Sequence, residues 1–274
     1  MRRLVVGCGY LGRRVARLWR EAGDDVYATT RGCNAAALTA EGLTPLTLDV
    51  TQGVVGALPV VDTALFAVGR DRRSSATSFD IHVQGLRAVL DALPDPAPRV
   101  IYVSSTSVYA QDGGEWVDEE SACKPTREGG KACLAAERLL VGHARGHDAV
   151  VLRMAGLYGP GRVPRSADVT TGRPIAGSPD AFLNLIHVDD AARAVVAAAA
   201  LGATAYRSFI ISDGQPPTRG AYVALLAERL GVAPPPFEGG RGHGKRARNE
   251  RATRELGWQP GYPSYREGLA EALR

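Results

Sequence analysis

Arg3-Leu-Val-Val-Gly7-Cys-Gly9-Tyr-Leu-Gly12-Arg-Arg-Val-Ala16 is the stretch of sequence that decides the fold. Residues 4–6 are aliphatic, as in a strand that is covered on both faces, and from Val15 onward apolar residues return with a helical period. Between them, Gly7 permits a sharp turn, Gly9 lets a pyrophosphate approach the backbone, and Gly12 allows close packing of helix on strand. The free amides of the helix N-terminus would face that anion. The stretch therefore predicts a strand, a glycine turn and a helix that together bind a nucleotide.

Strands and helices alternate along much of the remaining chain. The hydrophobic pattern predicts strands at 26–29, 44–48, 63–68, 100–104, 149–154 and 208–212, and helices at 35–41, 78–93, 130–144 and 189–201. Such alternation requires right-handed crossovers and a parallel sheet. We therefore predict an α/β fold with a doubly wound parallel (Rossmann) sheet.

Composition limits the class of protein further. The chain has 274 residues, of which 45% are hydrophobic, enough for a substantial core. It shows neither the pattern of a signal peptide nor an apolar run long enough to span a membrane, which predicts a soluble, cytoplasmic protein without a membrane partner. The cysteines are scattered without metal-ligand spacing, which argues against a zinc site and against a disulfide framework: Cys8, Cys33, Cys123 and Cys133.

The formal net charge of +4 owes much to the segment between Arg241 and Arg254. A nucleic-acid surface would need aromatic residues among these charges to stack bases, and the segment has none. The pattern favours a solvated surface, or an anchor for one anionic small molecule, and we expect no nucleic-acid partner.

The end of the second predicted strand should select the cofactor. The stretch at 28–32 is Ala-Thr-Thr-Arg-Gly, without the carboxylate that binds the ribose hydroxyls in NAD sites. Arg31 would instead offer a bidentate donor to the 2′-phosphate of NADP. NADP is therefore favoured, with NAD as the alternative. In the other interpretation, Arg31 points into solvent and Arg13 is the residue that contacts the phosphate.

Five segments in order carry a family resemblance: GCGYLG at 7–12, LDVT at 48–51, VSSTSVY at 103–109, RMAGLYGPGR at 153–162 and LIHVDDAARA at 185–194. With LGWQP at 256–260 and EGL at 267–269, they resemble an extended short-chain dehydrogenase/reductase of the NAD(P)-dependent epimerase/dehydratase kind. The resemblance implies a Rossmann domain over 1–154, completed by about 184–212. It also implies a small C-terminal α/β lobe for the substrate, made of 155–183 and 213–274.

The resemblance also implies a set of site residues. Cofactor contacts are expected at Gly7, Gly9, Tyr10, Leu11, Gly12, Arg31, Asp49, Val50, Ala67 and Lys131. Family members often pair through two long helices, here 78–93 and 130–144, so a homodimer is plausible.

The family's chemistry uses a Ser or Thr after the fifth strand and a Tyr-x-x-x-Lys pair on the next helix. The spacing of four places phenol and ammonium on one helix face, where the ammonium lowers the pKa of the phenol for proton transfer. Ser105 matches the serine and Lys131 the lysine, but Arg127 stands at the tyrosine position. With Val6 where extended members carry glycine, this departure resembles the atypical branch of the superfamily.

Three explanations for the missing tyrosine stay open. Tyr109 could supply the proton, although it could also merely pack against cofactor or substrate; the substrate could need no acid from the protein; or the chain could hold NADP without catalysis. The sequence thus predicts an NADP-dependent oxidoreductase that moves hydride to or from a carbonyl or alcohol carbon of a small molecule, with Ser105, Lys131 and Tyr109 as catalytic residues. A non-catalytic NADP sensor or scaffold is the alternative, and a sugar-nucleotide epimerase or dehydratase the third. The sequence does not identify the substrate.

Overall fold

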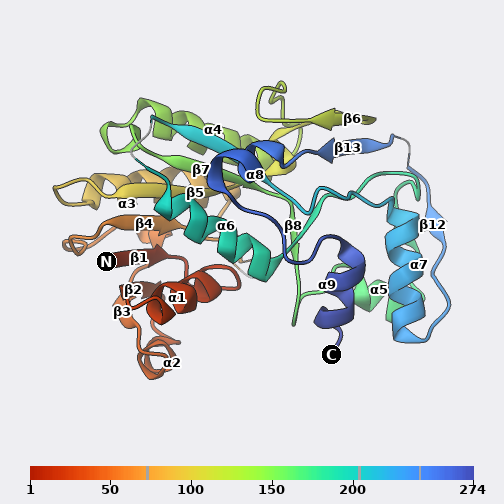
Figure 1. Cartoon of the computed structure of the whole chain (residues 1–274), viewed down its shortest axis with the longest axis horizontal. Coiled ribbons are helices and arrows are strands. Elements are labelled where there is room, and N and C mark those ends of the chain that lie inside the picture. The colour runs from red at the N-terminus through yellow and green to blue at the C-terminus, as the bar shows by residue number, and fades with distance from the viewer. Residues whose placement is uncertain (72–73, 203–204, 241) are drawn as a thin grey trace. The chain divides into compact units, whose positions relative to one another are not determined.

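The computed structural model of the chain describes residues 1–71, 74–202, 205–240 and 242–274. Its centre is a seven-stranded parallel sheet (Figure 1), which confirms the predicted Rossmann-like α/β fold with small C-terminal sheets. Across the sheet the strands follow the order β11 (Arg207–Ile211), β7 (Val150–Met154), β5 (Arg99–Ser105), β4 (Thr63–Phe66), β1 (Arg2–Val6), β2 (Asp25–Thr30) and β3 (Thr44–Thr47).

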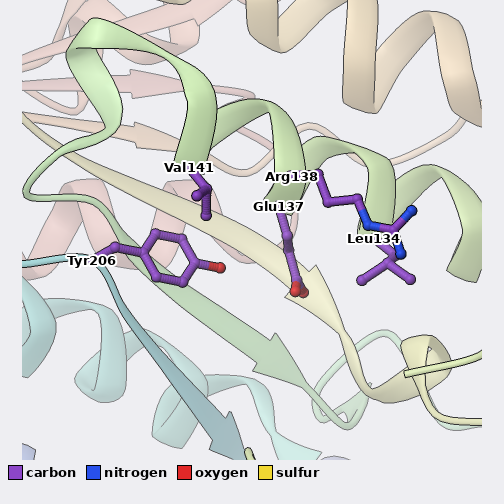
Figure 2. A pocket seen from close by; sticks show the side chains of 5 residues that line it. All are labelled: Leu134, Glu137, Arg138, Val141 and Tyr206. Atoms are coloured by element: carbon purple, nitrogen blue, oxygen red, sulfur yellow. The ribbon is translucent and has the colours of Figure 1, made fainter. Parts of the chain in front are cut away.

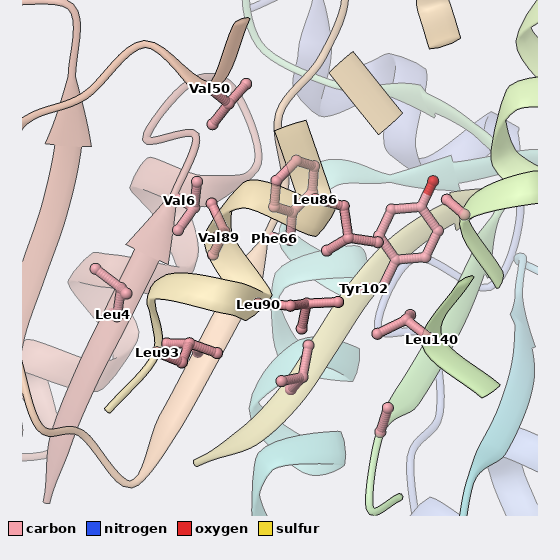
Figure 3. Close-up of a cluster of buried hydrophobic side chains, with 14 of the residues drawn as sticks. Leu4, Val6, Val50, Phe66, Leu86, Val89, Leu90, Leu93, Tyr102 and Leu140 are labelled. Carbon is pink, nitrogen blue, oxygen red and sulfur yellow. The ribbon is translucent and has the colours of Figure 1, made fainter. Parts of the chain in front are cut away.

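Alternation along β1 divides the core between the two faces of the sheet. Leu4 and Val6 belong to a buried cluster with side chains of α3 (Leu86–Ala92) and α4 (Glu128–Gly142), shown in Figure 3. Arg3 points to the other face, where its guanidinium lies 5.3 Å from the Trp19 ring of α1 (Gly12–Glu21). Successive residues of a strand face opposite sides, so α1 and the α3–α4 layer cover opposite faces.

The helix predicted over 78–93 is divided in the structure. Asp80–Gly85 form a π-helical turn, η2, and α3 begins only at Leu86. The turn brings Gly85 so close to the Val50 side chain that a Cβ at Gly85 would lie 2.9 Å from it. It also brings His82 Nδ1 within 2.9 Å of the Tyr102 hydroxyl on β5. π-helical turns are rare and often occur at functional sites.

The remaining elements are short. Helices are α2 (Ala35–Ala40), α5 (Ser166–Thr170), α6 (Val188–Ala200), α7 (Arg219–Leu230), α8 (Glu250–Leu256) and α9 (Tyr265–Ala272). Three parallel strand pairs are β8 (Gly156–Tyr158) with β10 (Leu185–His187), β9 (Ile175–Ala176) with β12 (Phe237–Glu238), and β6 (Gly113–Val117) with β13 (Gly244–Ala247). Among the described residues, none of the helices has both the length and the apolar character that a membrane crossing requires.

The chain forms two compact units. The first contains Met1–Val108, Lys124–Arg153 and Ala192–Phe209, and the second contains Tyr109–Cys123, Met154–Ala191 and Ile210–Arg274. The division predicted between 154 and 155 thus falls one residue from a boundary of the units, whereas 109–123 and 184–191 belong to the second unit.

Gly7 provides a test of the close packing at the glycine turn. Its φ is +93°, and an added Cβ would lie 2.7 Å from the Val68 amide nitrogen. Gly7→Ala should therefore lower the free energy of unfolding by about 2 kcal/mol or more, from backbone strain and steric overlap. Gly9→Ala is the matched control, since its Cβ would meet no atom within 4 Å. Equal stability of the two variants in urea unfolding would contradict this packing.

Candidate functional site

The glycine turn is fixed by the strand beside it. The Gly7 amide donates to the Thr29 hydroxyl on β2 at 2.9 Å, and the Gly9 amide donates to the Gly7 carbonyl at 2.8 Å. A Cβ at Gly12 would overlap that same carbonyl, so α1 starts in direct contact with the turn. Gly9 alone of the three is exposed with open space beside its Cα. The turn therefore leaves an uncovered stretch of backbone where a pyrophosphate would lie.

The first turn of α1 carries no acidic residue, so nothing there competes with an anion for the free amides. Leu11 is buried at the N-cap, and the Arg14 guanidinium lies 4.4 Å from the centre of the Tyr10 ring. Arg13 binds the Glu41 carboxylate through two nitrogens, one of them Nε at 3.0 Å. Arg13 is therefore held by the Glu41 carboxylate through two of its nitrogens.

Arg31 follows β2 directly, and its side chain is 56% exposed. One guanidinium nitrogen lies 3.1 Å from the Asp71 carboxylate. Asp49 accepts hydrogen bonds from the Thr51 hydroxyl at 2.7 Å and the Thr51 amide at 3.0 Å, and these bonds hold the pKa of Asp49 below its ordinary value. Val50 is buried beside this turn, and the Ala67 amide donates to the Val6 carbonyl. The first unit thus brings the predicted residues at 7–12, 31, 49–50 and 67 to the carboxyl ends of β1, β2, β3 and β4.

A buried ion pair sets the orientation of α4. Glu137 receives a hydrogen bond from the Ser104 hydroxyl at 2.6 Å and lies 2.8 Å from the guanidinium of Arg153 on β7. All three side chains are less than 10% exposed. Glu137 therefore marks the face of α4 that is turned toward the end of β5.

The residues that share this face are Gly129 and Cys133, at spacings of four. Cys133 is buried and interacts with Tyr102, Ser104 and the backbone of Ser105, and burial raises the pKa of its thiol. Gly129 has open space beside its Cα. Lys131 lies two residues from Cys133, roughly 200° around the helix, and is exposed. The Lys131 side chain thus points away from β5. This placement does not support the predicted role of Lys131 in catalysis and cofactor binding, which stays a prediction.

The structure also places Arg127 and the two other residues predicted to be catalytic, Ser105 and Tyr109. Arg127 is the N-cap residue of α4, with an extended backbone, so it shares no helix face with Lys131. The Ser105 hydroxyl, at the end of β5, accepts the Ser107 amide at 3.1 Å. Tyr109 is buried and belongs to the second unit.

A shallow groove of about 200 Å³ lies on α4 (Figure 2), lined by Leu134, Glu137, Arg138, Val141 and Tyr206. Its walls carry few polar groups, and Val141 is 65% exposed. The groove lies on α4, which includes most of the segment 130–144 that was predicted to pair with a second copy. The homodimer itself stays a prediction.

The basic segment has aromatic partners that are distant in sequence. Arg246 donates from Nε to the Gly114 carbonyl at 2.7 Å and lies 4.9 Å from the ring centres of both Trp116 and Phe182. Arg248 lies 5.3 Å from the same Trp116 ring. These contacts could not be predicted from the segment itself, because the aromatic residues lie elsewhere in the sequence. Arg241 lies outside the described residues.

Asp213, two residues beyond β11, is a buried carboxyl that sequence reasoning missed. One oxygen accepts the Gln215 amide at 3.0 Å, and the other has no partner within the described part of the chain. Burial raises the pKa of Asp213 to about 7. An isolated aspartate in a polar turn gives no signal of this kind, because burial is decided by residues far along the chain.

A parallel sheet whose first strand leads through a glycine turn into the N-terminus of a helix is the arrangement of a dinucleotide-binding protein. The model of the NAD dependent epimerase/dehydratase family matches residues 3–211. The chain belongs to this family, within the extended short-chain dehydrogenase/reductase superfamily, as the resemblance implied.

Two curated relatives span nearly the whole chain. "Protein YeeZ" of Escherichia coli K12 is 30% identical over 277 residues, covering 94% of this chain and 95% of its own length. The "3-diazoavenalumate denitrifying reductase" of a Streptomyces species is 28% identical over 309 residues, covering 98% of this chain and 99% of its own length. Among solved structures, MoeE5 in complex with UDP-glucose and NAD shares the fold, with a TM-score of 0.81, 22% identity and coverage of 100% and 97%.

The buried pair on α4 can be tested by removing one charge. Arg153→Leu leaves the Glu137 carboxylate buried without its cation, and we expect a loss of about 3 to 5 kcal/mol in urea unfolding. Replacing Glu137 and Arg153 together by leucine should cost less. Arg173→Leu, at an exposed pair with Asp168, is the control and should change stability by less than about 1 kcal/mol. A small effect of Arg153→Leu would show that the pair does not hold α4.

Asp213 predicts a pH dependence of stability. The folded-state pKa of about 7 lies above the ordinary 3.8, so this group favours folding at low pH and loses that contribution as pH rises toward 7. Asp213→Asn should therefore stabilise the protein at pH 8, on the order of 3 kcal/mol, and much less at pH 4. Urea unfolding at both pH values measures this difference. The exposed Asp180→Asn should show none, and a pH-independent effect of Asp213→Asn would contradict the assignment.

Proposed function

We propose that the protein is an NADP-dependent oxidoreductase that acts on a small organic molecule. The observation that carries this proposal is the exposed Gly9 backbone at the uncapped N-terminus of α1, with Arg31 rather than a carboxylate directly after β2. This arrangement fits a dinucleotide with a 2′-phosphate. When bound, the cofactor supplies or accepts a hydride at its nicotinamide ring.

The residues of the first unit have separate roles in this proposal. The amides at the start of α1 bind the pyrophosphate, and Arg31 turns from Asp71 to the 2′-phosphate. Asp49 and Val50 contact the adenine, and Ala67 leaves room for the cofactor to pass over β4. The Ser105 hydroxyl at the end of β5 accepts the Ser107 amide and keeps its own hydrogen to donate to the reacting group. The second unit, which contains Tyr109, receives the substrate.

Two other functions have support of their own. The exposure of Lys131 and the absence of a tyrosine from α4 support a non-catalytic NADP sensor. The fold shared with MoeE5, which was solved with UDP-glucose and NAD, supports a sugar-nucleotide epimerase or dehydratase. The oxidoreductase is preferred because a relative that spans the chain from end to end is itself a reductase.

The cofactor choice depends on Arg31 and Asp71. Arg31→Ala should weaken NADPH binding on the order of tenfold or more and leave NADH binding nearly unchanged, because only NADPH carries the 2′-phosphate. Asp71→Asn should strengthen NADPH binding, since it removes a carboxylate that competes for Arg31. Titration of the nicotinamide fluorescence measures both affinities.

The exposed Arg254→Ala is the control for the loss of one positive charge. Tighter binding of NADH than of NADPH to the unaltered protein would show that NAD is the cofactor. In that case Asp71, rather than Arg31, would be the residue that recognises the ribose.

A further inference from the structure

The side chains around the end of β5 in the first unit are already committed to one another. The Ser104 hydroxyl donates to Glu137, which is paired with Arg153, and the Tyr102 hydroxyl is bound to His82. Lys131 is exposed on the opposite face of α4. A carbonyl that accepts a hydride must also accept a proton, and among the described side chains around the end of β5 none is arranged to give one.

Titration behaviour agrees with this geometry. Burial lowers the pKa of His82 to about 4, so the imidazole is neutral near pH 7. Burial also raises the pKa of Tyr102 well above its ordinary value and raises that of Cys133, so both hold their protons. Arg127 stays protonated at any physiological pH. The hydrogen bonds of this network thus join groups that do not change their protonation near neutral pH.

Gly129 leaves space where a proton donor would stand. It is one helical turn before Cys133 on the face that Glu137 defines, and a Cβ there would meet no atom within 4 Å. Gly130 beside it packs so closely that an added Cβ would overlap the Ser107 carbonyl oxygen, and larger residues therefore do not fit there. The face that approaches β5 therefore begins with a residue that has no side chain.

We propose that the substrate is an electrophile that takes up a hydride without a proton, and that its chemical class is an aromatic diazonium compound. This inference rests on the proposed NADP-dependent function and selects its substrate. Replacement of the diazonium group forms one C–H bond from a hydride and breaks the C–N bond, whose electron pair leaves with N₂. The positive charge of the diazonium group passes to the oxidised nicotinamide, so atoms and charge balance with no proton moved.

The relative from Streptomyces supports this choice from a separate direction. Its name describes a reductase that removes nitrogen from a diazo compound, and it aligns over 98% of this chain. Neither its name nor its identity of 28% fixes the substrate here. The agreement lies in the chemistry, because the replacement of a diazonium group by hydride requires no acid from the protein.

The test compares two probes of the same shape, 4-carboxybenzenediazonium and 4-carboxybenzaldehyde, with NADPH that carries deuterium at C4. With the diazonium we expect NADPH consumption well above the protein-free rate, release of one N₂ for each NADPH, and benzoate deuterated at the ring carbon that carried nitrogen. The rate should be the same in H₂O and D₂O. With the aldehyde we expect no alcohol.

The outcomes separate the inference from the function on which it rests. Absence of NADPH binding in the fluorescence titration would overturn the proposed function itself. Binding of NADPH with reduction of the aldehyde, and a slower rate in D₂O, would keep that function and overturn the inference. Loss of aldehyde reduction in Tyr109→Phe would then identify the proton donor. Binding of NADPH without turnover of either probe would overturn the inference and favour a sensor.

A binding measurement tests the placement of α4 independently of turnover. The inference expects Lys131→Met to bind NADPH with the same affinity as Arg138→Met, an exposed change on the same helix. A selective loss in Lys131→Met would show that the lysine reaches the cofactor, and would overturn the inference. The double variant Gly129→Tyr/Cys133→Lys places phenol and ammonium four residues apart on the face toward β5, and we expect it to gain aldehyde reduction. The comparison of the two probes stands even where that variant does not fold.

Discussion

The buried contact among Ser104, Glu137 and Arg153 is the constraint that decides which face of α4 meets β5. It joins β5, α4 and β7 in the middle of the first unit and fixes the rotation of α4 about its own axis. Once Glu137 is turned toward β5, helical geometry decides which other residues share that face. A pair of buried charges is expensive to desolvate, so it persists only in one arrangement with its hydrogen bonds in place.

Much of the fold was predictable because it depends on local pattern. The aliphatic run at 4–6, the three glycines and the alternation of strand and helix each have a direct physical reading, and the sheet follows from them. The division of 78–93 into a π-helical turn and α3 was not predictable in this way. It depends on Val50 and Tyr102, which reach that segment only in the folded chain.

In the candidate site, too, local pattern predicts some features, whereas others depend on contacts that form only in the folded chain. The glycines and Arg31 lie where the sequence placed them, since they follow strands whose ends meet at one edge of the sheet. Lys131 was predicted as the lysine because it opens the helix before Leu134 and Glu137, and two residues along a helix are enough to turn a side chain to the opposite face. To predict which face of α4 meets β5, one would need to know that the Glu137 side chain is buried. The sequence does not show this, because a glutamate in a helix is usually exposed. Its partner Arg153 lies sixteen residues further along the chain, on another element, so the pair exists only in the folded protein.

The division of the chain into interleaved segments has a consequence for synthesis on the ribosome. Each unit consists of three stretches, and the second takes its last stretch from Ile210–Arg274. The first unit can be completed once Phe209 has emerged from the ribosome, whereas the second also needs Ile210–Arg274. Residues 109–123 and 154–191 are therefore made long before the partners that cover them. A pause in translation after Phe209 would therefore leave the first unit complete while the segments of the second still lack Ile210–Arg274.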